Sequence, residues 1–129
     1  MDGTTGQFTN YPARQIDSTY KNFEVNRIAE DPQHDIWLTA NYGVYKLDTK
    51  TGKFRKYIND DLRSICVDAK GRMWAGGFRG LYAFNKTKDK FELFANEDSA
   101  VNISGVVNII EDDQKNLWVS ASSAIIKIN

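Results

Sequence analysis

The sequence has few of the residues that catalysis and metal binding rely on. Among its 129 residues it holds one cysteine, Cys66, and one histidine, His34. A single cysteine excludes a disulfide within the chain, and a single histidine excludes a cluster of His and Cys ligands with metal-binding spacing. The sequence also contains no Gly-rich phosphate loop and no nucleophile motif. We therefore expect a protein that is not an enzyme and that uses no cofactor and no metal ion.

An excess of positive or negative charge is also missing, as are long apolar runs. Seventeen Lys and Arg residues balance seventeen Asp and Glu residues, so no overall field draws in nucleic acid or an anionic membrane. No apolar run reaches the roughly 18 to 20 residues of a membrane span, and residues 1–4 do not begin a signal peptide. We expect no nucleic-acid partner, no direct membrane insertion and no targeting signal. With 41% apolar and 26% charged residues, residues 1–129 have the composition of one globular domain.

What the sequence does have is an internal repeat centred on its three tryptophans. They are separated by 37 and 44 residues, a range in which one repeat forms one unit stacked on its neighbours. An Asp precedes each Trp by six residues; in the first two copies a Gly follows by six and a Phe by 17. The copies hold Asp31, Trp37, Gly43 and Phe54; Asp68, Trp74, Gly80 and Phe91; and Asp112, Trp118 and, in place of the Gly, Ala124. The function must therefore be sought on surfaces that these copies share or vary.

Each copy has the pattern of up to four β-strands, A to D. Strands A and B are short apolar runs separated by a polar turn that begins with the repeated Asp, and strands C and D follow after two further turns. Strand A is predicted at 25–30, 62–67 and 106–111, strand B at 36–40, 73–77 and 117–121, strand C at 44–47, 81–84 and 125–128, and strand D at 53–58 and 90–95. No segment shows the apolar period of a helix.

The N-terminal residues resemble a further strand D. Residues 5–12 contain Thr5-Gly-Gln-Phe8, which matches Thr51-Gly-Lys-Phe54. With this strand the chain has three sets of four strands. We expect an all-β fold of β-propeller blades, which are four-stranded antiparallel sheets, in a single domain over 1–129 with blade repeats at about 23–58, 62–95 and 104–129.

The repeated residues are better explained by structure than by chemistry. The tryptophans lie in mid-strand between apolar neighbours, so we expect them to pack between blades. The three Asp residues suggest turn locks, in which the carboxylate accepts hydrogen bonds from backbone amides ahead of it, rather than an acidic ring that binds a cation. Gly43 and Gly80 follow a sharp turn, where we expect a backbone conformation that is costly for other residues. Cys66 is expected to be a buried core thiol and His34 to be solvated.

The copies follow, to different degrees, one residue pattern: D-x-x-G-x-φ-W, then small residues, then G-φ-Y and a later φ-x-x-Y/F, where φ denotes an apolar residue. This pattern resembles the two-component regulator propeller repeat. The middle copy follows this pattern most closely, whereas Ala124 departs from it in the third. The resemblance implies a module from the periplasmic ligand-sensing region of hybrid histidine kinases and related regulators, many of which sense glycans. Such proteins have many more repeats and additional kinase, membrane and regulator parts. The resemblance therefore implies a piece of a larger protein or a small stand-alone relative.

The loops between strands indicate where a ligand would bind. In the usual blade order, the D–A and B–C loops share one face of a propeller and the A–B and C–D turns share the other. The B–C loops differ between copies and carry Asn41, Tyr42, Phe78 and Arg79. Aromatic rings beside amide and guanidinium donors suit glycans or other small polar ligands. We predict these four residues as ligand-binding. The alternative function is a scaffold for protein–protein interaction without a small-molecule ligand.

The number of blades leads to a hypothesis of self-association. Three blades are fewer than the roughly four to eight of known propellers. The N-terminal strand lacks its own blade, and the third blade lacks strand D. Exchange of the N-terminal strand between two chains would give a homodimeric six-bladed ring. The rival hypothesis is a fragment whose missing blades come from neighbouring sequence.

Overall fold

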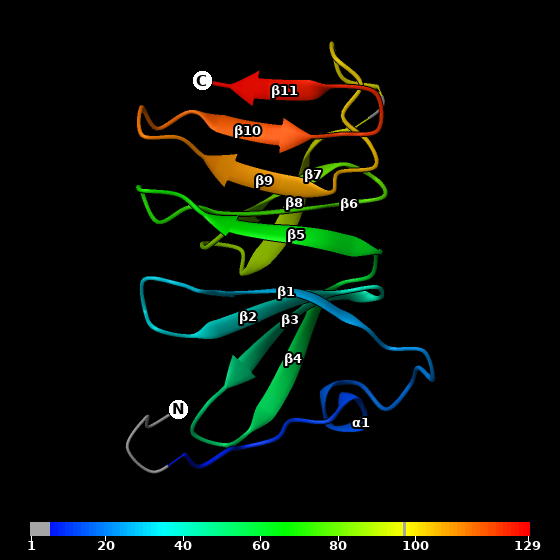
Figure 1. Cartoon of the computed structure of the whole chain (residues 1–129), viewed down its shortest axis with the longest axis vertical. Coiled ribbons are helices and arrows are strands. Elements are labelled where there is room, and N and C mark those ends of the chain that lie inside the picture. Colours follow the sequence, from blue (N-terminus) through cyan, green and yellow to red (C-terminus); the bar gives the residue numbers. More distant parts are fainter. Residues whose placement is uncertain (1–5, 97) are drawn as a thin grey trace.

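The fold is a row of three antiparallel β-sheets, one for each sequence repeat, in a computed structural model that describes residues 6–96 and 98–129 (Figure 1). Blade 1 consists of β1 (Val25–Glu30), β2 (Ile36–Ala40), β3 (Gly43–Asp48) and β4 (Lys53–Ile58); blade 2 of β5 (Leu62–Val67), β6 (Met73–Gly77), β7 (Leu81–Asn85) and β8 (Lys90–Ala95); and blade 3 of β9 (Asn108–Glu111), β10 (Leu117–Ser120) and β11 (Ile125–Ile128). Strands pair in sequence order within each blade. The predicted all-β architecture is confirmed.

All strands except β9 match the predicted bounds to within one residue at each end, and β9 and an unpredicted helix are the larger differences. Strand β9 begins at Asn108 instead of residue 106, because the amide of Val106 donates to the carbonyl of Gly77 in blade 2 at 2.9 Å. Helix α1 (Ala13–Ile16) was not predicted. Four residues are too short for an apolar period to show in the sequence.

The N-terminal strand predicted at 5–12 is not formed in the single chain. Residues 6–12 adopt no β-strand structure, and residue 5 lies outside the described part of the chain. The ring of Tyr11 packs edge-on against Phe54 of β4, with 5.8 Å between the ring centroids. An isolated strand is not stable without a sheet to pair with, so this segment instead lies near blade 1 (Figure 1). Exchange of the segment between two chains, and the six-bladed ring, remain predictions.

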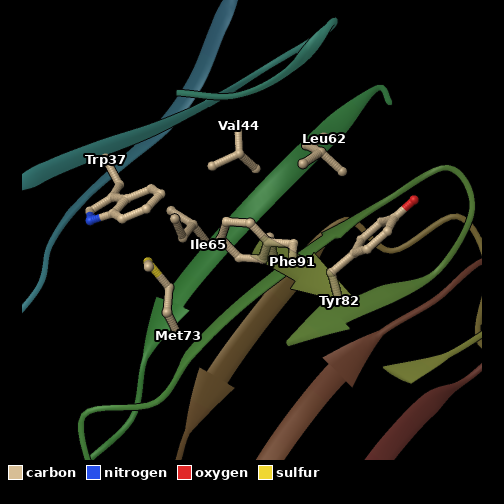
Figure 2. Close-up of a cluster of buried hydrophobic side chains, with 8 residues drawn as sticks. Trp37, Val44, Leu62, Ile65, Met73, Tyr82 and Phe91 are labelled. Atoms are coloured by element: carbon tan, nitrogen blue, oxygen red, sulfur yellow. The ribbon is translucent and has the colours of Figure 1, made fainter. Parts of the chain in front are cut away.

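The core between blades 1 and 2 is centred on Trp37, whose side chain is 1% exposed. Its ring centroid lies 4.8 Å from that of Tyr57, 5.3 Å from that of Phe84 and 5.9 Å from that of Phe91. Figure 2 shows Trp37 and Val44 of blade 1 facing side chains of blade 2. The buried members from blade 2 are Leu62, Ile65, Met73, Ala75, Tyr82 and Phe91. Trp37 packs between blades as predicted.

The second core lies between blades 2 and 3 and is centred on Trp74, which is 4% exposed. Its remaining buried members are aliphatic: Leu81, Ala95, Ile103, Val106, Ile109, Leu117 and Val119. A buried hydrogen bond joins the two inner strands here, because the amide of Ile109 donates to Ser64 Oγ at 3.1 Å. Trp74 also packs between blades as predicted.

Trp118 differs from the other two tryptophans, because no further blade follows blade 3 in the described chain. It is half-buried, and the strand register places Ile110 and Ile125 on its side of the sheet. Ile110 is 54% exposed and Ile125 is 72% exposed. We call these three residues the open face of blade 3. The predicted packing of Trp118 between blades is not formed within the described chain.

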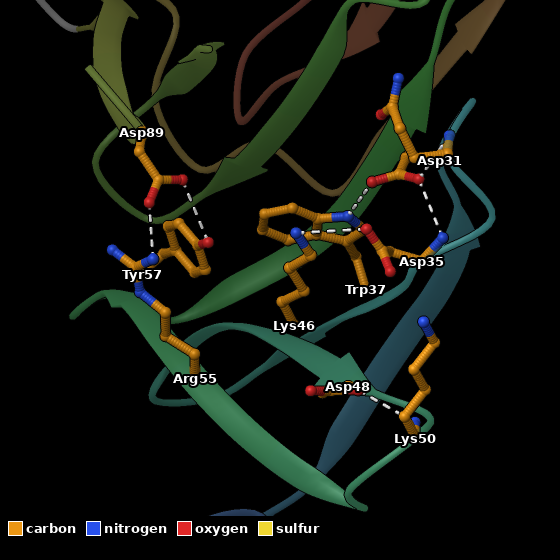
Figure 3. Close-up of polar contacts among 10 residues, drawn as sticks. Asp31, Asp35, Trp37, Lys46, Asp48, Lys50, Arg55, Tyr57 and Asp89 are labelled. Carbon is orange, nitrogen blue, oxygen red and sulfur yellow. Dashed lines mark hydrogen bonds and ion pairs between the residues drawn. The ribbon is translucent and has the colours of Figure 1, made fainter. Parts of the chain in front are cut away.

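The three A–B turns share one hydrogen-bond arrangement, shown for the first copy in Figure 3. Asp31 Oδ1 accepts from the amides of Gln33 and Asp35, both at 2.9 Å, and Asp31 Oδ2 accepts from Trp37 Nε1 at 2.7 Å. The equivalent donors are Lys70, Arg72 and Trp74 to Asp68, and Gln114, Asn116 and Trp118 to Asp112. The predicted turn lock is confirmed. The structure adds that each lock also holds the indole of its own repeat.

The two repeated glycines are required for different reasons. Gly80 has φ 145°, a conformation that L side chains rarely adopt, and a Cβ there would collide with the carbonyl oxygen of Ala95. The prediction is confirmed at this residue. Gly43 does not have a positive φ, so the prediction of an unusual backbone conformation is wrong there. Its Cβ would instead collide with the carbonyl oxygen of Ile58 on the neighbouring strand β4.

Cys66 lies beside the second core, and His34 lies in an exposed turn. Cys66 is half-buried beside the second core, which is less buried than predicted. Burial, followed by the nearby carboxylates of Glu111 and Asp68, raises the pKa of its thiol. The side chain of His34 is 82% exposed in the first A–B turn, as predicted.

Candidate ligand-binding face

The loops between strands fall on two faces, as predicted. The B–C and D–A loops lie along the right-hand edge of Figure 1, and the A–B and C–D turns lie along the left-hand edge. On the right, the amide of Phe78 donates to the carbonyl of Asp61 at 3.0 Å, and the amide of Arg79 donates to Asp60 Oδ2 at 3.3 Å. The B–C loop of blade 2 is therefore tied to the D–A loop that precedes this blade. We call the first surface the loop face and the second the turn face.

Asn41 holds the chain that enters blade 1. Its Oδ1 accepts from the amide of Glu24 at 2.9 Å, and its Nδ2 donates to the carbonyl of Asn22 at 2.5 Å. Its own amide donates to the carbonyl of Glu24 at 3.2 Å. Both ends of the side-chain amide are thus engaged within the protein, and this residue positions a loop of the predicted site.

Tyr42 belongs to an aromatic cluster at the blade 1 end of the loop face. Its ring stacks on that of Tyr20, with 3.8 Å between the centroids and 5° between the planes. Lys56 Nζ lies 4.7 Å from the centroid of Tyr20 and donates to the Tyr20 hydroxyl at 3.2 Å and to Asn59 Oδ1 at 2.8 Å. The cluster combines a stacked aromatic pair with an ammonium group at its edge. Such groups can pack against the C–H face of a sugar and bind its hydroxyls.

Two pairs of tyrosine and aspartate fix the loops beneath this face. The hydroxyl of Tyr45 donates to Asp17 Oδ2 at 2.6 Å, and the hydroxyl of Tyr82 donates to Asp60 Oδ2 at 2.9 Å. Burial and the bond to Asp60 raise the pKa of Tyr82 to about 12, and burial and Asp17 also raise the pKa of Tyr45. Burial opposes ionisation of Asp17, but the hydrogen bond from Tyr45 and others outweigh it and lower its pKa. At neutral pH both tyrosines are therefore neutral donors that anchor D–A loops.

Phe78 and Arg79 lie at a groove between blades 2 and 3. The side chain of Phe78 is 73% exposed. The groove has a volume of about 350 Å³ and is lined by Phe78, Arg79, Leu93, Asn96, Ser104, Gly105 and Ser122. Its walls are tied together, because the amide of Gly105 donates to the carbonyl of Phe78 at 3.0 Å and Ser122 Oγ donates to the carbonyl of Ser104 at 3.1 Å. We call it the loop groove.

The four predicted residues therefore fall into two groups. Asn41 and Tyr42 lie at blade 1, and neither lines the loop groove that Phe78 and Arg79 share. The polar lining of this groove, from Asn96, Ser104 and Ser122, lies in B–C and D–A loops, which are expected on this face, but these residues are not among the four predicted ones. Two of these residues come from the long D–A loop at 96–107, which has no counterpart at a fixed spacing in the other repeats, so no repeat pattern could identify them.

Two other kinds of feature are absent from residues 6–96 and 98–129. No group of three or more His, Cys, Asp or Glu side chains is placed to hold a metal ion. No helix in this part of the chain combines the length and apolar character needed to cross a membrane.

A protein-family model matches the middle of the chain. Residues 56–79 match the model of the two component regulator propeller. They include strand β5, the second Asp–Trp turn and the B–C loop with Phe78 and Arg79. The chain carries a two-component regulator propeller repeat. The resemblance inferred from the residue pattern is confirmed.

Solved structures show the same fold. The chain resembles extracellular domains assigned to two hybrid two component systems of B. thetaiotaomicron. The match to BT4673 has 20% identity over 87% of this chain and 16% of that chain, with a TM-score of 0.72. The match to BT3049 has 15% identity over 81% and 15%, with a TM-score of 0.71.

A third solved structure, of virginiamycin B lyase from Staphylococcus aureus, has 18% identity over 81% of this chain and 41% of that chain, with a TM-score of 0.60. At these identities the likeness shows the fold alone, because one fold carries many functions. The chain spans 16% and 15% of the two extracellular domains that it matches. No curated protein matches its sequence.

Proposed function

We propose that this chain is part of a ligand-sensing β-propeller of a two-component system and that its loop face binds the ligand. The regulator propeller repeat and the fold likeness to extracellular domains of hybrid systems support this function. The proposal implies a periplasmic location and a binding role without catalysis. It rests on the loop groove, where the ring of Phe78, 73% exposed, stands beside Arg79.

The lining of the loop groove favours a glycan with an acidic substituent. The ring of Phe78 supplies a face for C–H stacking, and the guanidinium of Arg79 binds a carboxylate or sulfate through two parallel hydrogen bonds. Asn96, Ser104 and Ser122 supply donors and acceptors for hydroxyl groups. The volume of about 350 Å³ lies at the lower end of the range for ligand pockets, which suits a small ligand or one end of a longer one.

A glycan-array screen followed by titration of the best acidic glycan tests this function. Saturable binding that is lost in Phe78→Ala and Arg79→Ala supports it. Phe8→Ala and Arg55→Ala remove the same side-chain types away from the groove and should retain full binding. Tyr42→Ala reports whether the ligand extends to the aromatic cluster of blade 1. Absence of saturable binding to any glycan, or equal binding by the groove variants, contradicts the proposal.

The open face of blade 3 favours the alternative function, association with another protein. We propose that a second copy of this chain covers it. Val25 and Ile28 of blade 1 are 47% and 71% exposed. They occupy the repeat positions of Leu62 and Ile65, which are buried in the core formed by Trp37. Blade 1 of one copy can therefore pack against the open face of another as blade 2 packs against blade 1.

Light scattering at micromolar concentration tests this association. The full chain should be a dimer, and Ile125→Lys should be a monomer, whereas Val101→Lys, which adds the same charge at an exposed loop residue outside both contacts, should not change the mass. A chain without residues 1–12 should remain dimeric if the blade faces carry the contact and become monomeric if the N-terminal strand is exchanged. A monomeric full chain contradicts both modes of association.

A further inference from the structure

The turn face has a groove of its own between blades 1 and 2. Its volume is about 420 Å³, and it is lined by Asp31, Pro32, Gln33, Trp37, Lys46, Lys70, Gly71, Arg72, Met73, Phe84, Lys86 and Asp89. We call it the turn groove. It lies at the opposite edge of the blades from the loop face, and none of its residues lines the loop groove. Any ligand bound here is therefore distinct from the one proposed above.

The carboxylates of the turn groove already have hydrogen-bond donors. Asp31 accepts from two backbone amides and from Trp37 Nε1, and Asp89 accepts from Arg55 Nη1 at 2.5 Å and from the hydroxyl of Tyr57 at 3.2 Å (Figure 3). These bonds stabilise the charged carboxylates without a metal ion. The acidic side chains are thus occupied within the protein.

The cations of the turn groove outnumber these carboxylates and are not all paired. Lys46 Nζ lies 3.2 Å from Asp35, and Arg72 Nε lies 2.9 Å from Asp68. Within residues 6–96 and 98–129, Lys70 and Lys86 form no ion pair. The groove therefore presents two ammonium groups without an ion-pair partner beside two cations that are paired. An anion with several oxygens is the ligand that such a set of donors suits.

The apolar base of the groove strengthens this attraction. Trp37 and Met73 are 1% and 5% exposed, and Phe84 is half-buried beside them. Lys46 Nζ lies 5.3 Å from the centroid of the Trp37 ring. Figure 3 shows this ammonium group beside the indole. Low-polarity walls reduce the screening of charge by water, so a bound anion is attracted more strongly here than on an open surface.

The blade architecture does not itself require these cations. At the next interface, the repeat position of Lys46 is held by Ala83, that of Lys70 by Gln114 and that of Arg72 by Asn116. Lys115 takes the position of Gly71, so the third A–B turn has one cation where the second has two. The structure of the turn lock is nevertheless the same in all three turns. The charge is therefore a property of the turn groove and not of the repeat.

From this arrangement we propose that the turn groove is a binding site for an oxyanion of the sulfate or phosphate type, either free in solution or attached to a larger molecule. Lys70 and Lys86 supply the principal charges, Lys46 and Arg72 border the site, and Trp37 lies beneath it. Because Trp37 is the one tryptophan that lines the groove, its indole N–H signal reports occupancy.

Titration of the full chain with sodium sulfate and sodium phosphate at constant ionic strength tests the proposal, with the three indole N–H signals followed by NMR. The Trp37 signal should shift saturably while those of Trp74 and Trp118 do not. The double variant Lys70→Gln/Lys86→Gln should bind at least tenfold more weakly. Lys90→Gln/Lys115→Gln removes the same charge outside the groove and should bind like the parent. Lys70→Gln introduces the residue found at the equivalent position of the third repeat, so the fold tolerates it.

A second arm distinguishes the two sources of the anion. Glucose 6-sulfate that binds more tightly than sulfate indicates a sugar-borne group, and equal affinity indicates the free anion. Glucose should not bind at the turn groove. Equal affinity of both double variants for sulfate, or the absence of a saturable Trp37 shift with all of the anions, overturns the proposal. The loop-groove variants Phe78→Ala and Arg79→Ala should retain this Trp37 shift. Failure of the anion-site proposal can therefore be distinguished from failure of the proposed sensing function.

Discussion

The two interfaces between blades hold a tryptophan at the same repeat position but surround it differently. Trp37 meets the rings of Tyr57, Phe84 and Phe91. Trp74 contacts one ring, that of Phe94, which is itself 54% exposed. The reason lies in the following blade. Blade 2 supplies Phe91 from its outer strand β8, whereas blade 3 has three strands and supplies no counterpart.

This difference separates two contributions that a sequence repeat combines. The repeat determines where each Trp lies and which Asp accepts its N–H. The next blade determines how deeply the indole is buried and what it packs against. Repeated residues that share one geometry should therefore contribute differently to stability. The contribution should increase with the extent to which the next blade buries the residue.

The largest effect should come from the tryptophans. Trp37→Ala should lower the free energy of unfolding by roughly 3–5 kcal/mol, because it removes a fully covered aromatic side chain from a packed core. Trp74→Ala should cost less, and Trp118→Ala, at the open face of blade 3, should cost least. Urea denaturation of the three variants measures the order. Equal losses would show that the next blade does not set the contribution.

The second effect concerns the repeated glycines. Gly80→Val should destabilise by on the order of 1–3 kcal/mol, because the residue has a positive φ and any Cβ would collide with the backbone. Gly80 also borders the second interface, where a Cβ would lie 2.8 Å from the carbonyl oxygen of Ile103. Gly43→Ala should destabilise less. The three heavy atoms nearest to its new Cβ include one backbone oxygen, that of Ile58, whereas those nearest to a Cβ at Gly80 include two. Thermal unfolding measures both, and melting of Gly80→Val at the parent temperature contradicts the assignment.

The third effect tests the turn locks. Asp68→Ala should cost about 1–3 kcal/mol, because the buried indole N–H of Trp74 and two backbone amides lose their acceptor. Asp112→Ala should have a smaller effect, since Trp118 is half-buried and water can replace the carboxylate. Chemical denaturation of the pair measures the difference, with Asp113→Ala in the same turn as the control.

The locks of Asp68 and Asp112 should also make stability depend on pH. For Asp68, burial raises the pKa, but hydrogen bonds from Trp74 and Arg72 outweigh it, so the pKa lies below its ordinary value; hydrogen bonds, the one from Trp118 foremost, also lower that of Asp112. A lowered pKa in the fold means that the stabilisation is present above the unfolded value of about 3.9 and is lost as pH falls below it. The free energy of unfolding should therefore fall below about pH 4. The Asp68→Asn variant should show a shallower acid decline, and an unchanged slope contradicts the assignment.

The smallest effect concerns the ion pair that joins the outer parts of blades 1 and 2. Arg55 Nη1 lies 2.5 Å from Asp89 Oδ2, but the two side chains are 61% and 47% exposed. Exposed pairs contribute little and are screened by salt. Asp89→Asn should lower the midpoint of thermal unfolding slightly at low salt and not at all near about 0.5 M sodium chloride. A decrease in the midpoint of thermal unfolding that does not depend on salt would assign the effect to the hydrogen bond from Tyr57 instead.

The sequence predicted the repeated parts of this molecule well and its loops poorly. The strands, the turn locks and the division of the connections between a loop face and a turn face follow from residues such as Asp68 and Trp74, whose surroundings recur at fixed spacing. The bond between Tyr45 and Asp17 could not be predicted, because the Asp lies in a D–A loop of irregular length. The loop groove likewise depends on Asn96 and Ser104, which no local pattern marks. The turn groove depends on which side chains of two blades meet, and this is set by packing across about 40 residues of sequence.

The Asp–Trp turn lock also has a consequence for how the chain folds. The bond joins residues six positions apart, whereas the packing of one blade on the next joins residues some 37 positions apart. Short loops close quickly and hairpins form within roughly 1–10 μs, whereas contacts between distant residues are slower. Each A–B hairpin can therefore form with its indole already oriented before any blade meets its neighbour. The repeat thus supplies three separate local starting points for folding, and the slow step is left to the docking of blades.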